Sequence, residues 1–322
     1  MTVSELVIQT NNLTKVYKTG RKQKLALENL NLSVYRGEIF GYLGPNGAGK
    51  TTTIRMLLDL IRPTSGSAKV LGMDTQASAV DIHKQIGFLP GELALWNNER
   101  AINIIRYFGR VRGKVDMAYV RQLADRLQFD TSMRVRDYST GNKRKLGLIL
   151  ALMNRPQLLI LDEPTSGLDP LMQQVFNELM LEVKREGRTV FLSSHLLSEV
   201  QAICDRVAIL RTGQLKAVET VEDLTHVDFR WVSIRTRNLQ GLVSRLGSVP
   251  GVTEVAQKNS HIELRLNGDF DPLMRALNDQ YVVDLRVKEP TLEEIFLTFY
   301  DNNPAVKRHH AEVEHVEKEQ VS

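Results

Sequence analysis

Residues 44–51, Gly-Pro-Asn-Gly-Ala-Gly-Lys-Thr, have the types and spacing of a loop that holds phosphate groups. They fit the pattern GxxxxGK[ST], in which glycines let successive backbone N–H groups point at phosphate oxygens that a side chain would block. Lys50 adds a positive charge toward the β- and γ-phosphates, and Thr51 offers a hydroxyl to Mg²⁺. The pattern predicts that the chain binds a nucleoside triphosphate.

The segments on either side of this loop are those that such a loop requires. A short apolar strand, Glu38–Leu43, is expected before it, and a helical run, Thr52–Leu60, after it. A strand, a glycine-rich loop and a helix in this order place the loop at the helix N-terminus, where phosphate binds well. We therefore expect a phosphate site and not a turn that is merely rich in glycine.

A second group of chemically capable residues follows another predicted strand. The run Leu158–Leu161 is continuously apolar, as expected for a parallel strand covered on both faces, and it ends in Asp162 and Glu163. Carboxylates at this end of a parallel strand lie on the ligand side of the sheet. Asp162 is then placed to hold Mg²⁺ through water, and Glu163 to polarise the water that attacks the γ-phosphate.

Two further segments begin predicted helices. Tyr138–Lys143 precedes the helical run Arg144–Met153, with small residues at what would be an anion-binding helix N-terminus. The segment Pro164–Pro170 turns the chain into a helix that begins near Leu171.

Together these segments resemble the ATP-binding cassette (ABC) family, specifically its nucleotide-binding subunits, over nearly all of residues 5–225. Gly44–Thr51 is similar to the family's Walker A loop, and Leu158–Glu163 to its Walker B strand. Ser166–Pro170 is similar to its D-loop, and Tyr138–Asn142 to its signature sequence. P-loop kinases and GTPases lack the signature.

The resemblance implies ATP and Mg²⁺ as cofactors and assigns roles to individual residues. Glu163 and His195, the switch histidine after the strand Thr189–Leu192, are implied to be catalytic, and Thr51 and Asp162 to bind the metal. Tyr17 matches the aromatic residue that stacks on adenine. The implied ATP contacts are Tyr17, Gly44, Pro45, Asn46, Gly47, Ala48, Gly49, Lys50, Thr51, Thr52, Ser139, Gly141 and Asp169.

The chain departs from the family pattern at two places. Thr140 stands where the signature usually has its first glycine, so the site requires Thr140 to adopt a negative φ. Gly91, with Glu92 beside it, stands where the family usually has a glutamine that touches Mg²⁺. Either Glu92 replaces that glutamine or the loop acts through its backbone. We favour the backbone, because an unneutralised carboxylate beside ATP phosphates is repulsive.

Composition sets the wider frame. A chain of 322 residues is expected to form two domains. Its net charge of +4 does not by itself indicate nucleic acid, and its single cysteine, Cys204, excludes an internal disulfide and fits a reducing compartment. We expect Cys204 to serve in packing. No secretory signal and no long apolar run are evident, so a transport function would require another chain to cross the membrane.

These observations predict an α/β fold, a doubly wound P-loop NTPase sheet with an inserted helical subdomain, followed by a small α+β, ferredoxin-like accessory domain. The expected limits are 1–225 for the ATPase domain, with the helical part at about 95–155, then 226–301 for the accessory domain and 302–322 for a disordered tail. The accessory domain follows the order βαββαβ. Its predicted elements are Trp231–Arg235, Leu239–Leu246, Gly251–Ala256, His261–Leu266, Pro272–Leu277 and Val282–Val287, with a last helix at Leu292–Tyr300.

Other residues have plainer predicted roles. The apolar stripes on predicted helices in the region 95–155 are expected to be core. Trp96 is expected either to line a groove that accepts a membrane subunit or to take part in ordinary packing. The basic residues around the signature are expected to form a solvated face, although they could also attract a triphosphate. Arg21, Lys22 and Lys24, in an early loop, are likewise expected to form a solvated face, and the tail histidines are expected to be solvated. The stripes are Ala101, Ile104, Ile105 and Phe108, and Tyr119, Leu123 and Leu127; the basic residues are Arg134, Arg136, Lys143, Arg144 and Lys145.

The resulting hypothesis is an ATP-hydrolysing subunit of an ABC exporter. Two copies are expected to face each other head to tail and to work with a transmembrane permease from the cytoplasmic face of the membrane. The alternative is a soluble ABC ATPase that acts on ribosomes or DNA, although the two cassettes or long coiled-coil insertion usual in those proteins are absent from this sequence. A regulatory module without turnover is disfavoured by the presence of Glu163 and His195. The transported substrate cannot be predicted, because selectivity would lie in the membrane subunit.

Overall fold

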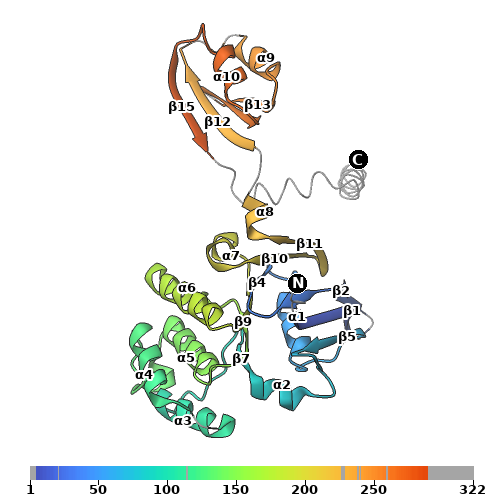
Figure 1. Cartoon of the computed structure of the whole chain (residues 1–322), viewed down its shortest axis with the longest axis vertical. Coiled ribbons are helices and arrows are strands. Elements are labelled where there is room, and N and C mark those ends of the chain that lie inside the picture. The colour runs from blue at the N-terminus through green and yellow to red at the C-terminus, as the bar shows by residue number, and fades with distance from the viewer. Residues whose placement is uncertain are drawn as a thin grey trace. The chain divides into compact units, whose positions relative to one another are not determined.

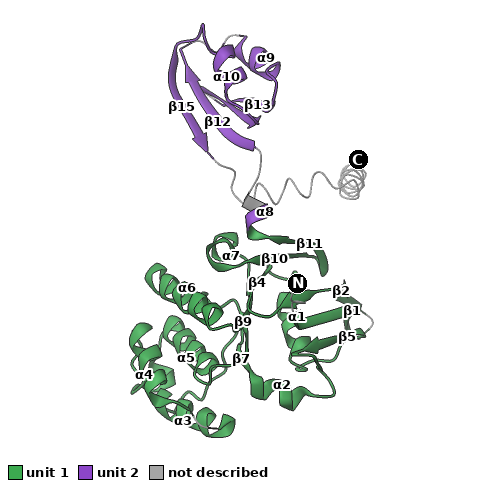
Figure 2. Ribbon diagram, viewed as in Figure 1, with its two compact units in different colours: residues 1–221 green, residues 222–322 purple. Residues whose placement is uncertain are grey.

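The computed structural model describes residues 5–288, except 21, 114, 226–228, 238, 240 and 259. The chain divides into two compact units, residues 1–221 and 222–322 (Figure 2). The sequence places the boundary after residue 225, and the division in the structure follows Val221. The predicted helix Leu292–Tyr300 and the predicted disordered tail lie outside the described residues.

The first unit is organised around a six-stranded sheet whose strands follow the order β11-β10-β4-β9-β8-β7 (Figure 1). The neighbours from β10 to β7 are parallel, and β11 forms an antiparallel pair with β10. Strands β4, β8 and β9 are buried along their whole length, as expected for central strands covered on both faces. Their bounds are β4 Ile39–Leu43, β7 Ile86–Leu89, β8 Leu158–Asp162, β9 Thr189–Ser194, β10 Arg206–Arg211 and β11 Gln214–Thr220.

A second sheet in this unit is antiparallel and was not predicted as a separate layer. Its path is β2-β1-β5-β6, with β3 paired to β1. Helix α1, Lys50–Leu57, packs against strands of both sheets, so one apolar core joins the two layers. The helix ends three residues before the predicted Leu60, and Asp59 then takes a positive φ of 53°. The new strands are β1 Leu6–Thr19, β2 Lys22–Leu30, β3 Ser33–Tyr35, β5 Ser65–Val70 and β6 Met73–Asp74.

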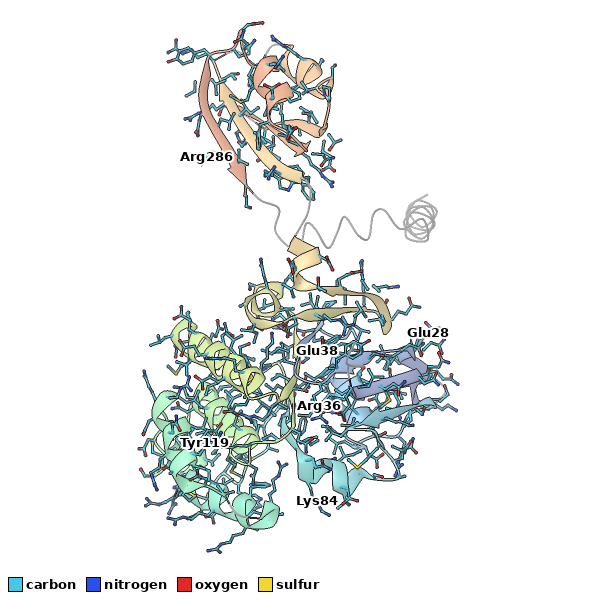
Figure 3. The ribbon with its side chains drawn as sticks, in the orientation of Figure 1. Glu28, Arg36, Glu38, Lys84, Tyr119 and Arg286 are labelled. Carbon is cyan, nitrogen blue, oxygen red and sulfur yellow. The ribbon has the colours of Figure 1, made fainter. Side chains whose placement is uncertain are left out.

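The region between β7 and β8 is helical, as predicted (Figure 1). The stripe residues Ala101, Ile104, Ile105, Leu123 and Leu127 are buried, which confirms them as core. Phe108 and Tyr119 (labelled in Figure 3) are half-buried. The helices of the first unit are α2 Ala79–Gln85, α3 Ala101–Arg112, α4 Met117–Arg126, the 3₁₀ turn η1 Val135–Asp137, α5 Thr140–Leu152, α6 Pro170–Arg185 and α7 Leu197–Ile203.

Helices α6 and α7 follow β8 and β9, and the predicted catalytic residues Glu163 and His195 come directly after these two strands. Helix α7 also packs on β4, where Gly41 leaves room for its side chains: a Cβ on Gly41 would lie 2.7 Å from Cγ1 of Val200 and 3.1 Å from Sγ of Cys204. Burial raises the pKa of the Cys204 thiol, which keeps it protonated. The prediction that Cys204 serves in packing is confirmed.

The second unit has the predicted order βαββαβ after the short helix α8, Val221–Thr225. Its sheet has the order β13-β14-β12-β15 with antiparallel neighbours, and α9 and α10 contribute to its apolar core. The opposite, polar face of the sheet includes Arg286 of β15 (Figure 3) and borders a hollow. The bounds are β12 Phe229–Thr236, α9 Leu242–Gly247, β13 Val252–Lys258, β14 His261–Asn267, α10 Asp271–Ala276 and β15 Val282–Lys288.

Candidate functional site

The loop between β4 and α1 has a backbone that only glycine fits at its critical positions. Gly47 and Gly49 have φ angles of +82° and +110°. A Cβ on Gly49 would lie 2.5 Å from the carbonyl oxygen of Ala26, and one on Gly44 would lie 2.4 Å from that of Leu210. The loop is thus packed against β2 and β10 while it leads into the N-terminus of α1, an arrangement suited to binding an anion.

A cavity of about 240 Å³ opens over this loop. Tyr17 of β1 lines it, so the structure brings this predicted residue to the loop from another sheet. Lys24 of β2 is its cross-strand partner and also lines the cavity, whereas the sequence predicted a solvated face for it. The lining residues are Tyr17, Lys24, Ala26, Pro45, Asn46, Gly47, Gly49, Lys50, Thr51, Thr52 and Glu163.

Lys50, the first residue of α1, is buried beneath the loop. Its ammonium donates hydrogen bonds to the carbonyl oxygens of Gly44 at 2.5 Å and Pro45 at 3.3 Å. It also lies 3.1 Å from Oε1 of Glu163. The side chain therefore joins the phosphate loop to the end of β8.

Asp162, at the end of β8, is 1% exposed, and each of its carboxylate oxygens accepts a hydrogen bond from a hydroxyl group. Thr51 donates to Oδ2 at 2.8 Å, and Ser193 of β9 donates to Oδ1 at 2.6 Å. A buried carboxylate needs such partners. The structure thus brings the two predicted metal ligands, Thr51 at the start of α1 and Asp162 at the end of β8, into contact.

Glu163 lines the cavity, and His195 contacts it from the segment after β9. Nδ1 of His195 lies 2.6 Å from Oε2 of Glu163, and the histidine ring is partly exposed. Glu163 has a φ of +51°, a conformation that L-residues rarely adopt. Its backbone N–H donates to Oγ of Ser193 at 3.0 Å, which helps to hold this conformation.

Arg144 of α5 was missed as a site residue. The prediction of a solvated face is wrong for Arg144 and Lys145, which are 4% and 9% exposed, whereas Arg134 and Arg136 are exposed as predicted. Burial lowers the pKa of Arg144, and the nearby carboxylates of the β8 end act in the opposite direction. The apolar run that follows Lys145 was a signal that this part of the helix enters the core.

Ser139 and Gly141 lie at the start of α5, which begins at Thr140 and not at the predicted Arg144. Oγ of Ser139 caps the helix by accepting from the N–H of Asn142 at 3.2 Å. Thr140 is helical and has no positive φ, which meets the condition stated above. Neither Ser139 nor Gly141 is among the described residues that line the cavity over the phosphate loop.

The D-loop lies against this helix start. A Cβ on Gly141 would be 2.6 Å from the carbonyl oxygen of Gly167, so the two segments touch through their backbones. Asp169 caps α6, with Oδ1 accepting from the N–H of Met172 at 3.0 Å. Its carboxylate is exposed and is likewise not among the described residues that line the cavity.

The loop after β7 contacts the site through Gly91. A Cβ on Gly91 would lie 3.1 Å from Oδ2 of Asp162, while Glu92 is exposed. Further along, Trp96 is 51% exposed, and its ring contacts those of Tyr107 and Phe108 of α3 at centroid distances of 4.9 and 6.0 Å. These three residues form a partly exposed aromatic cluster on the helical region.

Comparison with known proteins agrees with this geometry. The family model described as ABC transporter matches residues 27–166. An uncharacterized ABC transporter ATP-binding protein of Synechocystis is 32% identical over 308 residues, which cover 90% of this chain and 84% of the relative. The bacitracin transport ATP-binding protein BcrA of Bacillus licheniformis is 39% identical over 214 residues, or 65% of this chain and 68% of that protein.

A solved ATP-binding subunit of an ABC transporter has 29% sequence identity and a TM-score of 0.61, and the match covers 68% of this chain and 91% of that one. The chain belongs to the ABC transporter ATP-binding proteins. As a member of this family it binds ATP and acts as the ATPase subunit that energises a transporter. Within the described part of this ABC ATPase, no helix is long and apolar enough to cross a membrane.

Proposed function

We propose that this chain energises an exporter and that the residues around Lys50 bind and hydrolyse Mg²⁺–ATP. The main support is that Glu163, which lines the cavity together with Lys50, contacts both Lys50 and His195, although the three residues come from separate segments. The loop 44–51 binds the triphosphate through its N–H groups and Lys50. Tyr17, on the cavity wall, stacks on adenine.

Thr51 and Asp162 are the residues that hold Mg²⁺. Their side chains present oxygen ligands, the type that Mg²⁺ prefers, and these oxygens lie 2.8 Å apart beside the loop. Ser193 holds Oδ1 of Asp162, which leaves Oδ2, the oxygen beside Thr51, to bind the metal. When bound, the metal neutralises charge on the phosphates.

Glu163 acts as the general base for the attacking water, and His195 holds Glu163 and reaches the γ-phosphate. The 2.6 Å contact between their side chains supports this pairing. Glu163 lines the cavity beside Lys50, and we place the attacking water next to its carboxylate. Proton transfer to a positioned carboxylate is a usual source of rate in such reactions.

The ATPase works as a head-to-tail dimer in which Ser139 and Gly141 complete the partner's site. Both residues lie at the start of α5, where Ser139 is exposed and Gly141 is half-buried. Neither is among the described residues that line the cavity of their own chain. A helix N-terminus with an exposed serine suits the phosphates of a facing copy. Asp169, at the adjacent D-loop, lies on the same contact surface.

A transmembrane permease docks on the aromatic cluster of Trp96, Tyr107 and Phe108, which holds the ATPase at the cytoplasmic side of the membrane. Partly exposed aromatic side chains are typical anchors of protein interfaces. A role in transport is supported by the 39% identity to a bacitracin transport ATP-binding protein, and we propose export as its direction. The loop at Gly91 connects this surface to Asp162.

Purification of the tagged full chain from native membranes tests this proposal. We expect a multi-span membrane protein to co-purify, with ATP hydrolysis stimulated by that partner. Recovery with ribosomes or DNA instead would support the soluble alternative and would overturn the transport function. A matched purification of a Trp96→Asp variant shows whether the partner is held through the aromatic cluster.

A further inference from the structure

Arg144 connects three parts of the site through one buried side chain. It lies on the second turn of α5, the helix that Ser139 caps. Its Nη1 donates to the carbonyl oxygen of Pro90 at 2.7 Å, and its Nη2 donates to the carbonyl oxygen of Glu163 at 2.7 Å. The guanidinium therefore spans the loop after β7 and the loop after β8.

Both partners of Arg144 are backbone carbonyls, which defines what the contact can do. Removing a guanidinium from water carries a large penalty, so two short bonds in a buried position indicate a specific use. Bonds to carbonyls fix the path of the main chain and leave the carboxylates free for other contacts. The two-pronged shape of the guanidinium holds both carbonyls at a set separation.

Glu163 is the residue whose backbone most needs such support. Its positive φ is sterically disfavoured, and this conformation aims the carboxylate at Lys50 and His195. Ser193 holds the N–H of Glu163, and Arg144 holds its C=O. The peptide groups on both sides of the Glu163 Cα are thus fixed by side chains from other elements.

We propose that Arg144 is a positioning residue that sets the Glu163 carboxylate and links it to the loop at Pro90–Gly91. This inference rests on the proposed function of Glu163. A shift of the Pro90 carbonyl or of the first turns of α5 moves the guanidinium and, through it, the backbone of Glu163. The link gives the loop a connection to hydrolysis in a chain that has Gly91 where its family usually has glutamine.

The test compares steady-state hydrolysis by the full chain with the variants Arg144→Gln and Arg144→Lys. We expect Arg144→Gln to lower kcat by about tenfold or more, as for other groups that orient a reactive ligand, with little change in the KM for ATP. Arg144→Lys should recover only part of kcat, because one ammonium cannot bond both carbonyls in the same geometry. Arg136→Gln, which removes an exposed arginine from the same region, is the matched control and should leave both constants unchanged.

A second comparison separates positioning from general damage to the fold. If Arg144 acts through Glu163, Arg144→Gln should not slow single-turnover hydrolysis further in a Glu163→Gln background. Equal slowing in both backgrounds would overturn the inference, as would an unchanged kcat in Arg144→Gln. A wild-type chain that does not hydrolyse ATP would instead refute the proposed function. If Arg144→Gln does not fold, the same comparison with Arg144→Lys decides.

Discussion

Nζ of Lys50 lies 3.1 Å from Oε1 of Glu163, so the cation of the phosphate loop and the carboxylate assigned to hydrolysis form one partly buried ion pair. Glu163→Gln removes the negative partner of this ion pair, so the ammonium of Lys50 can interact with the phosphates alone. We therefore expect hydrolysis to fall by about 10²–10⁴-fold, the usual loss for a general base, while ATP binds at least as tightly as before. Titration calorimetry and phosphate release measure the two effects.

The control for this variant is Asp81→Asn, an exposed acid on α2 that pairs with Lys84. It should leave binding and hydrolysis unchanged. If Glu163→Gln loses ATP binding in parallel with hydrolysis, Glu163 supports the loop and is not the base.

A composite site predicts that specific activity rises with protein concentration, because each chain supplies half of each pocket. Lys50→Ala and Ser139→Ala should each be inactive alone, since each lesion falls in both sites of its homodimer. Mixing them equally should recover about a quarter of the wild-type rate, because half of the dimers are mixed and each mixed dimer keeps one intact site. Activity that stays constant on dilution, with no recovery on mixing, would exclude the shared site.

Gly91 lies close to the carboxylate of Asp162, the proposed metal ligand, since a Cβ on Gly91 would lie 3.1 Å from Oδ2 of Asp162. Asp162 is held on both oxygens, so it has little freedom to move away. We expect Gly91→Val to lower partner-stimulated hydrolysis by about tenfold, a typical loss when a metal ligand is disturbed, and to lower ATP binding less.

Glu92→Ala is the paired variant and should leave Mg²⁺–ATP affinity nearly unchanged, because Glu92 is exposed. Titration of both variants with ATP, with and without Mg²⁺, makes the comparison. A large affinity loss in Glu92→Ala together with a silent Gly91→Val would show that Glu92 replaces the glutamine.

Trp96→Asp places a charge in the aromatic cluster and should weaken stimulation of hydrolysis by the permease while hydrolysis by the isolated chain changes little. Buried aromatic anchors of interfaces typically contribute about 2 kcal/mol or more. Val80→Asp, which alters an exposed apolar residue of α2, is the control. Equal stimulation of the wild type and Trp96→Asp would place the permease contact elsewhere.

The parts of the site that could be predicted are those written in contiguous sequence. The loop 44–51 and the acids Asp162 and Glu163 have local patterns tied to strand ends, and their positions follow from those patterns. The contacts of Arg144 could not be predicted, because they join carbonyl groups of Pro90 and Glu163, and a carbonyl leaves no trace in the sequence.

The same limit applies to the contacts between β1 and β2 in the antiparallel sheet. Lys24 lies beside Tyr17 only because β1 and β2 pair in a register that shifts twice along its length. Such shifts depend on local backbone irregularities that alternation of residue types does not encode. The antiparallel layer was therefore not predicted.

The order of the central strands also has a consequence for biosynthesis. Strand β4, which leads into the phosphate loop, pairs with β9 and β10, residues 189–194 and 206–211. A nascent chain that has left the ribosome only as far as residue 188 contains the whole loop but neither strand that flanks β4. Until those strands emerge, a fully apolar segment has two open edges, which is the kind of surface that aggregates or recruits chaperones. Nucleotide can therefore aid folding of this unit only late in translation, after nearly the whole unit has been made.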